Sequence, residues 1–215
     1  MIPLVNYNEL WSLLYQKKRG SGVDWDKRAP SFFRAVSNSN EADEIIPAMD
    51  LLPGDTVIDM GAGTGRFAIP LAKHVSHVTA IEPSSGMASY LKQGMADAGL
   101  SNYSVVSQKW EDIEVGKDIQ VHDVVFASNS LGFPDLAAGL KKLDEAAKRA
   151  VHILWFAGPD RHPMDEELKI RLGYKPGDSF GFDYIVIAHV LHDMGIYANI
   201  RVDPIKSMHT YDSLD

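Results

Sequence analysis

Short apolar runs alternate with amphipathic stretches along this chain from about residue 56 onward. Apolar runs bounded by turn residues predict strands buried on both faces, and apolar positions recurring every three or four residues predict helices. Glycines at 99 and 195 stand where helices usually end. The predicted strands are residues 56–60, 77–82, 103–107, 123–127, 150–156 and 197–202, and the predicted helices are residues 65–74, 84–98, 136–149 and 182–194.

This order of elements is typical of a doubly wound α/β fold. We expect a mostly parallel sheet of six strands with helices on both faces. Residues 1–50 contain separate helical stretches, one with an apolar face at Leu10, Leu13 and Leu14, and they predict a helical N-terminal cap. Residues 51–215 are predicted to form the α/β domain, which is long enough for one sizeable core.

A glycine-rich turn follows the first predicted strand. Glycines at 61, 63 and 65 let bare backbone approach a ligand, and the free N–H groups of the following helix point into the same space. This arrangement predicts a site for a nucleotide-like cofactor with an anionic group. The dinucleotide fingerprint Gly-x-Gly-x-x-Gly needs a third glycine where this chain has Arg66, so an NAD-dependent oxidoreductase is a less favoured alternative.

The Gly-x-Gly-x-Gly turn after the acidic strand end Asp59 resembles the class I S-adenosylmethionine (SAM) methyltransferases, over about residues 25–203. The resemblance implies that Asp59 and the turn hold the amino-acid end of SAM. Glu82 ends the second strand, where a carboxylate can accept hydrogen bonds from both ribose hydroxyls. The cofactor-binding candidates are Asp59, Gly61, Ala62, Gly63, Thr64, Gly65, Glu82, Pro83, Met87, Trp110, Glu111, Asp112, Ser128 and Asn129.

The adenine end of the cofactor is assigned to the residues after the third strand. In the family an acidic residue there accepts a hydrogen bond from the adenine amino group, and an apolar neighbour lies against the ring. Trp110 is the candidate for the apolar face, and Glu111 and Asp112 are both open as the acceptor. The alternative is a tryptophan packed in the core beside two solvated acids.

The methyl group is expected beyond the fourth strand, because ligands of open α/β sheets lie outside the carboxyl ends of the strands. Ser128 and Asn129 follow that strand. Asn129 is a candidate catalytic residue, and a plain loop is the alternative. Residues 25–29 resemble the segment that many small-molecule methyltransferases fold over the cofactor, so Arg28 and Tyr7 are candidates to reach the substrate.

The resemblance implies transfer of a methyl group to an N, O or C nucleophile of a small molecule by in-line displacement. The sulfonium already activates the methyl group, so the protein chiefly aligns the nucleophile and excludes water, which is worth roughly 7–11 kcal/mol. No acid or base stands out. The alternatives are an RNA methyltransferase, a corrin-ring methyltransferase and a non-catalytic SAM-binding domain.

Composition narrows the partners and the chemistry. The net charge is −8 and the chain has no long run of basic residues, which disfavours nucleic-acid binding through many phosphate contacts. The chain has no cysteine, which excludes disulfides and thiolate nucleophiles. His189 and His192 lack a third ligand nearby, so we expect no metal. No signal peptide or bilayer-spanning run is found, and we expect a cytoplasmic protein without membrane contact. The family's closing seventh strand is not found, so we expect an incomplete version of a longer protein.

Overall fold

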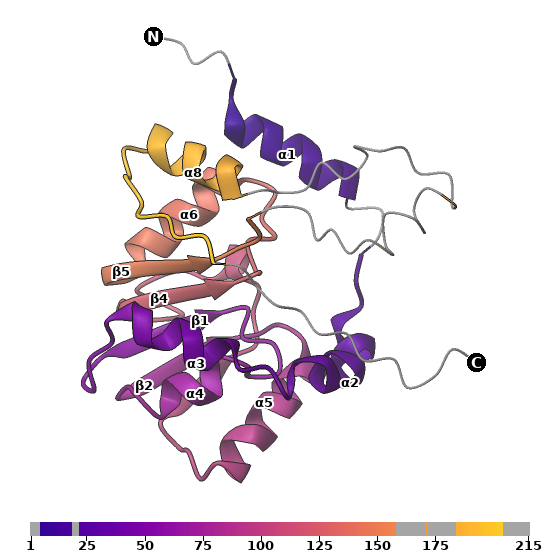
Figure 1. Ribbon diagram of the computed structural model, residues 1–215, viewed down its shortest axis with the longest axis vertical. Coiled ribbons are helices and arrows are strands. Elements are labelled where there is room, and N and C mark those ends of the chain that lie inside the picture. Colours follow the sequence, from indigo (N-terminus) through magenta and orange to yellow (C-terminus); the bar gives the residue numbers. More distant parts are fainter. Residues whose placement is uncertain (1–4, 19–21, 158–170, 172–183, 204–215) are drawn as a thin grey trace.

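The computed structural model describes residues 5–18, 22–157, 171 and 184–203 (Figure 1). Within these residues a five-stranded sheet forms in the order β3-β2-β1-β4-β5, and every neighbouring pair is parallel. Because the chain order changes direction between β1 and β4, their carboxyl ends flank a topological switch point. The strands are β1 (Thr56–Met60), β2 (His77–Ile81), β3 (Tyr103–Val106), β4 (His122–Ser128) and β5 (Ala147–Leu154).

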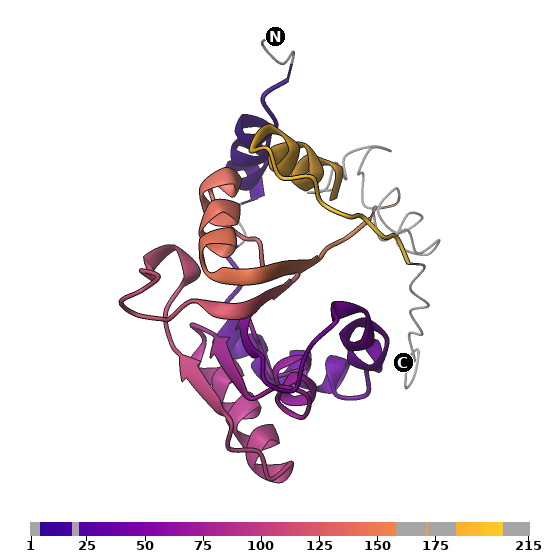
Figure 2. The same cartoon turned by 90° about the vertical axis from the view of Figure 1, so that its left-hand side faces the viewer.

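Helices cover both faces of the sheet (Figure 2). Side chains alternate across a strand, so Val57 of β1 joins the core on one face and Ile58 joins the core on the other. The Val57 face is covered by α3 (Glu41–Ile45), η2 (Ile46–Met49), α4 (Ala68–Ala72) and α5 (Ser85–Asp97). The Ile58 face is covered by α1 (Tyr7–Lys18), η3 (Trp110–Asp112), α6 (Leu136–Glu145) and α8 (Tyr184–Asp193).

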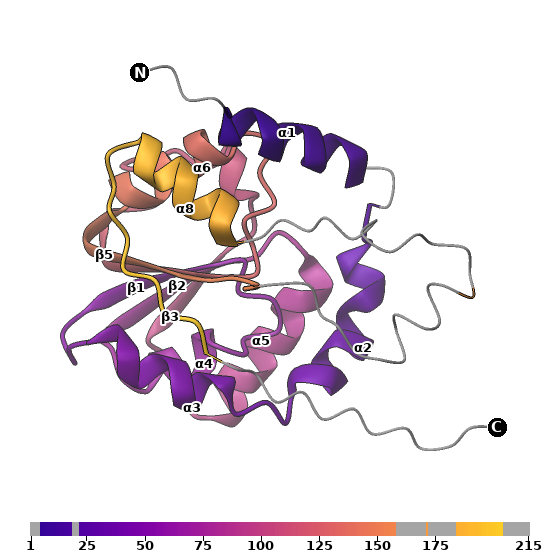
Figure 3. The ribbon, with the colours of Figure 1, turned by 45° about the horizontal axis from the view of Figure 1, so that its top comes forward.

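The N-terminal segment is helical and is built into both cores. Trp11 of α1 is 1% exposed, and its indole nitrogen donates to the Phe133 carbonyl at 2.8 Å. Ile46 and Met49 of η2 are buried in the core on the opposite face. Helix α2 (Trp25–Val36) lies beside α5, as Figures 1 and 3 both show.

Two sequence predictions need correction. The helix predicted for residues 136–149 ends at Glu145, and β5 begins at Ala147, which pairs with His122. Pairing with β4 outweighs the helix propensity of this alanine- and lysine-rich stretch. The sixth strand predicted for residues 197–202 is absent: residues 196–203 have no regular secondary structure, and Tyr197 is 81% exposed. The apolar positions there cover no core face, so their pattern specifies no strand.

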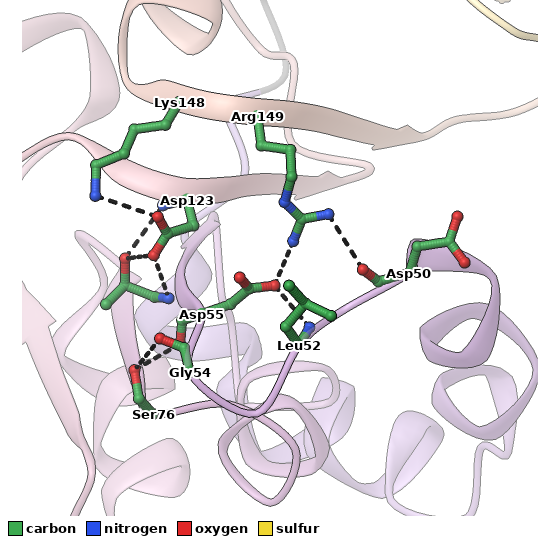
Figure 4. Close-up of polar contacts among 9 residues, drawn as sticks. Asp50, Leu52, Gly54, Asp55, Ser76, Asp123, Lys148 and Arg149 are labelled. Atoms are coloured by element: carbon green, nitrogen blue, oxygen red, sulfur yellow. Dashed lines mark hydrogen bonds and ion pairs between the residues drawn. The ribbon is translucent and has the colours of Figure 1, made fainter.

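The turn that leads into β1 is held by a buried carboxylate (Figure 4). Asp55 accepts a hydrogen bond from the Leu52 N–H at 2.8 Å and forms an ion pair with Arg149 of β5. The same guanidinium donates to the Asp50 carbonyl at 3.1 Å. The side chain of Asp55 is only 7% exposed, so the ion pair fixes the start of β1 against the edge strand.

Replacing Arg149 by methionine should lower the free energy of unfolding by about 2 kcal/mol, because it leaves a buried carboxylate without its cation. Urea denaturation measures this loss. The matched control is Lys117→Met, whose pair with Glu114 is exposed on both sides and should contribute less than about 0.5 kcal/mol. Equal losses in the two variants would show that the Asp55 pair has no special role.

Within the described part of the chain, no helix combines the length and the apolarity that crossing a bilayer requires.

Candidate functional site

The glycine turn lies at the switch point, directly after β1. Its glycines at 61, 63 and 65 have φ angles of +75°, +57° and +91°, a left-handed region that favours residues without a Cβ. The N–H groups of Gly61 and Ala62 both donate to the Ile81 carbonyl, at 2.9 and 3.1 Å. The turn is therefore fixed to the end of β2.

Packing explains two of the three glycines. A Cβ at position 61 would overlap the side chain of Ser130, and a Cβ at position 65 would come within 2.9 Å of Ile69. At Gly63 the nearest atom is Cε1 of Phe32, at an ordinary contact distance of 3.7 Å. The protein itself leaves room at Gly63, so the open backbone there is available to a ligand.

Glu82 faces the turn from the end of β2. One carboxylate oxygen accepts from the Gly63 N–H at 2.8 Å, and the other accepts from the Ser84 N–H at 2.7 Å. Glu82 is 6% exposed, and burial raises the pKa of its carboxyl while the two backbone N–H groups oppose that rise. The carboxylate is thus held in one orientation against the backbone of the turn.

Asp59 is the second buried carboxylate of the site. It is 2% exposed, and its Oδ2 atom has no hydrogen-bond partner among the described residues. Burial raises the pKa of Asp59 to about 7, against the opposing effects of the Arg66 charge and the Ala68 N–H; the Glu82 charge adds to the rise. Buried polar atoms normally have a partner, so this oxygen is suited to accept a hydrogen bond from a ligand.

Arg66 links the turn to two other elements. Its guanidinium pairs with Glu41 of α3, donates to the Ser128 hydroxyl at 3.1 Å and lies 4.7 Å from the centre of the Phe67 ring. Sequence reasoning used Arg66 only to argue against a dinucleotide and missed these contacts. The available signal was its position, one residue after the third glycine and close to Asp59.

Helix α2 is anchored to the first turn of α5, next to Glu82. Asp26 accepts from the hydroxyls of Ser84 and Ser85, at 2.9 and 3.1 Å, and from the Gly86 N–H at 2.6 Å. The hydrogen bonds from Gly86 and the two serines hold the pKa of Asp26 below its ordinary value. Sequence reasoning selected residues 25–29 as a cover but did not find this anchor.

The predicted adenine residues lie in η3. Trp110 is 3% exposed, its indole nitrogen lies 3.5 Å from the Gly139 carbonyl, and the Lys142 ammonium lies 5.7 Å from its ring. The ring is therefore packed in the core against α6, while Glu111 and Asp112 are exposed. The adenine contact of these residues stays a prediction.

The catalytic candidates lie on three separate elements. Asn129 follows β4 with a φ of +52°, and its N–H donates to the Leu154 carbonyl at 3.0 Å. Arg28 lies on α2, with its guanidinium 5.7 Å from the Trp25 ring. Tyr7 of α1 stacks on His189 of α8 with ring centres 4.0 Å apart. These contacts do not bring the three candidates together.

The remaining cofactor candidates lie in the glycine turn, around the start of α5 and at the end of β4. Ala62 and Thr64 of the turn are 7% and 3% exposed, and Met87 of α5 is 2% exposed. Pro83 is exposed, and Ser128 is partly buried against Arg66. Among the described residues, no group of three histidine, aspartate or glutamate side chains has the arrangement of a metal site.

Two cavities lie away from the turn. One of about 430 Å³ opens at the amino ends of the strands and is lined by His77, Thr79, Ser104 and His122 among others. The other, of about 540 Å³, lies between β5, α8 and residues 196–202. No residue of the glycine turn lines either of these two cavities.

The parallel strand order, the switch point and the glycine turn define a Rossmann-like cofactor-binding domain. Residues 57–150 match the family described as a methyltransferase domain. The fold is similar to that of magnesium protoporphyrin IX methyltransferase from Synechocystis with bound SAH, with a TM-score of 0.55, 19% identity, and coverage of 88% of this chain and 85% of that one. By this similarity residues 57–150 form a methyltransferase domain, within a Rossmann-like methyltransferase fold.

Two relatives show how far the sequence similarity extends. An uncharacterized protein of Haemophilus influenzae is 32% identical over 182 residues, which cover 83% of this chain and 65% of the relative. Ribosomal RNA small subunit methyltransferase G of Mycolicibacterium smegmatis is 34% identical over 113 residues, 49% of this chain and 46% of the relative. The chain thus spans less than two thirds of the length of either relative.

Proposed function

We propose that this protein binds SAM at the glycine turn and transfers its methyl group to a small-molecule acceptor. The observation that carries the proposal is the pairing of two buried carboxylates with one open turn. Asp59 has an unpartnered oxygen at the end of β1, and Glu82 faces the same turn from β2. A cofactor with a cationic amino group at one end and a ribose at the other fits these two acceptors.

Each end of the cofactor has a matching group in the chain. We assign the ammonium group to Asp59 and the ribose hydroxyls to Glu82. An ionised carboxylate has about four acceptor positions, and the two backbone N–H groups on Glu82 use only two of them. We assign the backbone of residues 61–65 to the methionine part, Pro83 and Met87 to the ribose side, and the exposed Glu111 or Asp112 to the adenine amino group, with Trp110 packed behind them.

The bound cofactor supplies a methyl group that its sulfonium activates. The protein's own part is to bind, orient and exclude water. The Asp26 contacts that fasten α2 to α5 support a role for residues 25–29 as a cover over the site. Asn129 and Ser128 lie at the end of β4, where the acceptor is expected, and Arg28 and Tyr7 are the candidates to reach it from the N-terminal helices.

RNA is the second candidate acceptor, because several relatives are named as ribosomal RNA methyltransferases. The net charge of −8 favours the small molecule, since RNA binding depends on neutralising phosphates. Transfer of a labelled methyl group from SAM separates the candidates when metabolite fractions and total RNA are offered in parallel. Label in RNA would overturn the small-molecule proposal, and binding without any transfer would favour a non-catalytic SAM-binding domain.

The affinity for S-adenosylhomocysteine should rise about 25-fold between pH 5.5 and pH 7.5, in proportion to the anionic fraction of Asp59. Burial raises the pKa of Asp59 to about 7 from its ordinary value of 3.8, so below pH 7 the folded protein holds this carboxyl neutral. Only the anion attracts the ligand's ammonium group, which stays mostly charged over this range. Isothermal titration calorimetry at several pH values measures the slope.

Asp59→Asn is the control for this pH dependence. It should bind more weakly and lose the slope, because the amide does not ionise. The free energy of unfolding of the wild type should fall as pH rises from about 4 to 7, because its buried Asp59 becomes an anion. Above pH 7, Asp59→Asn should therefore have the higher free energy of unfolding. If Asp59→Asn kept the wild-type slope of affinity against pH, a group other than Asp59 would be responsible for it.

A further inference from the structure

Lys142 of α6 contacts the end of η3 through its ammonium group. Its Nζ atom donates to three backbone carbonyls, those of Trp110 at 2.9 Å, Glu111 at 2.9 Å and Ile113 at 3.0 Å. An ammonium group has three N–H donors, so this side chain places all of them on one short segment. Hydrogen bonds from a charged donor are roughly twice as strong as neutral ones. Lys142 is accordingly partly buried, and its charge lies against the backbone of η3.

Helix η3 depends on contacts with other elements because it is only three residues long. Its own hydrogen bonds run from the Asp112 N–H to the Lys109 carbonyl at 3.0 Å and from the Ile113 N–H to the Trp110 carbonyl at 3.3 Å. A single turn gains no cooperativity from neighbouring turns, and the end of a helix leaves carbonyls without a partner inside it. The three bonds from Lys142 supply partners at that end.

The side chains of η3 divide between the core and the surface. The Trp110 ring is packed against α6, whereas Glu111 and Asp112 are exposed. The segment also follows the strand next to Glu82, because the Glu82 N–H donates at 3.0 Å to the carbonyl of Val106, the last residue of β3. A cofactor whose ribose binds Glu82 carries its adenine close to this segment, since the base is joined directly to the ribose.

We propose that Lys142 is a positioning residue that fixes η3, so that an acidic side chain of this segment, Glu111 or Asp112, accepts a hydrogen bond from the adenine amino group. The inference rests on the proposed function. Lys142 acts through the backbone of η3 and does not itself contact the cofactor. Its effect on η3 is present in the ligand-free protein, whereas its effect on recognition of the base is measured as a choice between purines.

The first measurement is amide hydrogen exchange in the ligand-free protein, followed by NMR. In Lys142→Met the N–H groups of Asp112 and Ile113 should exchange at least about tenfold faster than in the wild type, because the turn loses three charged hydrogen bonds. Lys141→Met is the matched control, since Lys141 precedes it on α6 with a side chain that is 71% exposed and pairs with Glu145 at 3.6 Å. This control should leave both exchange rates unchanged. Unchanged rates in Lys142→Met would overturn the inference.

The second measurement compares the affinities for S-adenosylhomocysteine and S-inosylhomocysteine by calorimetry. The inosine ligand has a carbonyl oxygen in place of the amino group, so it cannot donate to a carboxylate there. The wild type should prefer the adenosine ligand by at least about 30-fold, and in Lys142→Met this preference should fall to about fivefold. Lys142→Arg keeps a charged donor and should recover part of the preference. Lys141→Met should retain all of it.

The outcomes separate this inference from the proposed function. An unchanged preference in Lys142→Met, including an equal loss of affinity for both ligands, would make Lys142 a structural residue only and overturn the inference. If Lys142→Met does not fold, Lys142→Gln, whose amide keeps two N–H donors, replaces it in both measurements and should show smaller effects in the same direction.

The wild type alone gives two further outcomes. If it binds S-adenosylhomocysteine without preferring it to the inosine ligand, the inference is overturned and the proposed function stands. If it binds neither ligand, the proposed function is overturned together with the adenine contact. Faster exchange in Lys142→Met would then still show that Lys142 fixes η3.

Discussion

Gly63→Val is expected to abolish binding of S-adenosylhomocysteine while the protein still folds. The protein leaves room at this position, since a Cβ placed there would have its nearest neighbour 3.7 Å away on Phe32. A valine side chain would instead occupy the space in which the cofactor meets the backbone of the turn. We expect an affinity loss of at least about 100-fold, or roughly 2.7 kcal/mol. Isothermal titration calorimetry measures it.

Backbone strain is the confounding effect, because Gly63 has a φ of +57°. Gly99→Val is the matched control: Gly99 has a φ of +67°, has no atom within 4 Å of a Cβ, and lies beyond the end of α5. Both variants should lose roughly 1–3 kcal/mol of stability from the strained conformation. Only Gly63→Val should lose the ligand. Wild-type affinity in Gly63→Val would place the cofactor elsewhere.

Glu82→Ala is expected to weaken binding of the same ligand by about 100-fold, because truncation removes a charged acceptor worth roughly 1.5–3 kcal/mol per hydrogen bond. The variant also releases the N–H groups of Gly63 and Ser84, so the turn loses two bonds that orient it. We expect the free energy of unfolding to fall by about 1–2 kcal/mol. Calorimetry gives the affinity, and urea denaturation gives the stability.

Two further variants separate the effect of Glu82 on ligand affinity from its effect on the stability of the turn. Glu82→Gln keeps one oxygen acceptor, so it should retain much of the stability and lose an intermediate share of the affinity. Glu114→Ala removes an exposed glutamate in the loop after η3 and should change neither quantity. If Glu82→Ala bound the ligand as the wild type does, the ribose would have to contact another group, and the assignment of Glu82 would fail.

Local patterns predicted most of the sheet. The ranges predicted for the first four strands differ from the observed ones by at most one residue at either end. Each is a short apolar run between turn residues, and a parallel strand is buried on both faces. The glycine turn was equally readable, because left-handed backbone at three alternating positions selects glycine. Asp59 and Glu82 follow from the same logic, since Asp59 is the penultimate residue of β1 and Glu82 directly follows β2, both at the carboxyl edge of the sheet.

The sequence by itself therefore determined the sheet, the turn and the two carboxylates, because periodicity and turn chemistry are local properties. Tertiary structure alone decided the partners. Arg66 meets Glu41 and Ser128, which lie 25 and 62 residues away, and Asp26 meets Ser84 across 58 residues. It also placed Trp110 in the core and left residues 197–202 outside the sheet. Contacts of this kind depend on how distant elements pack, which no local pattern encodes.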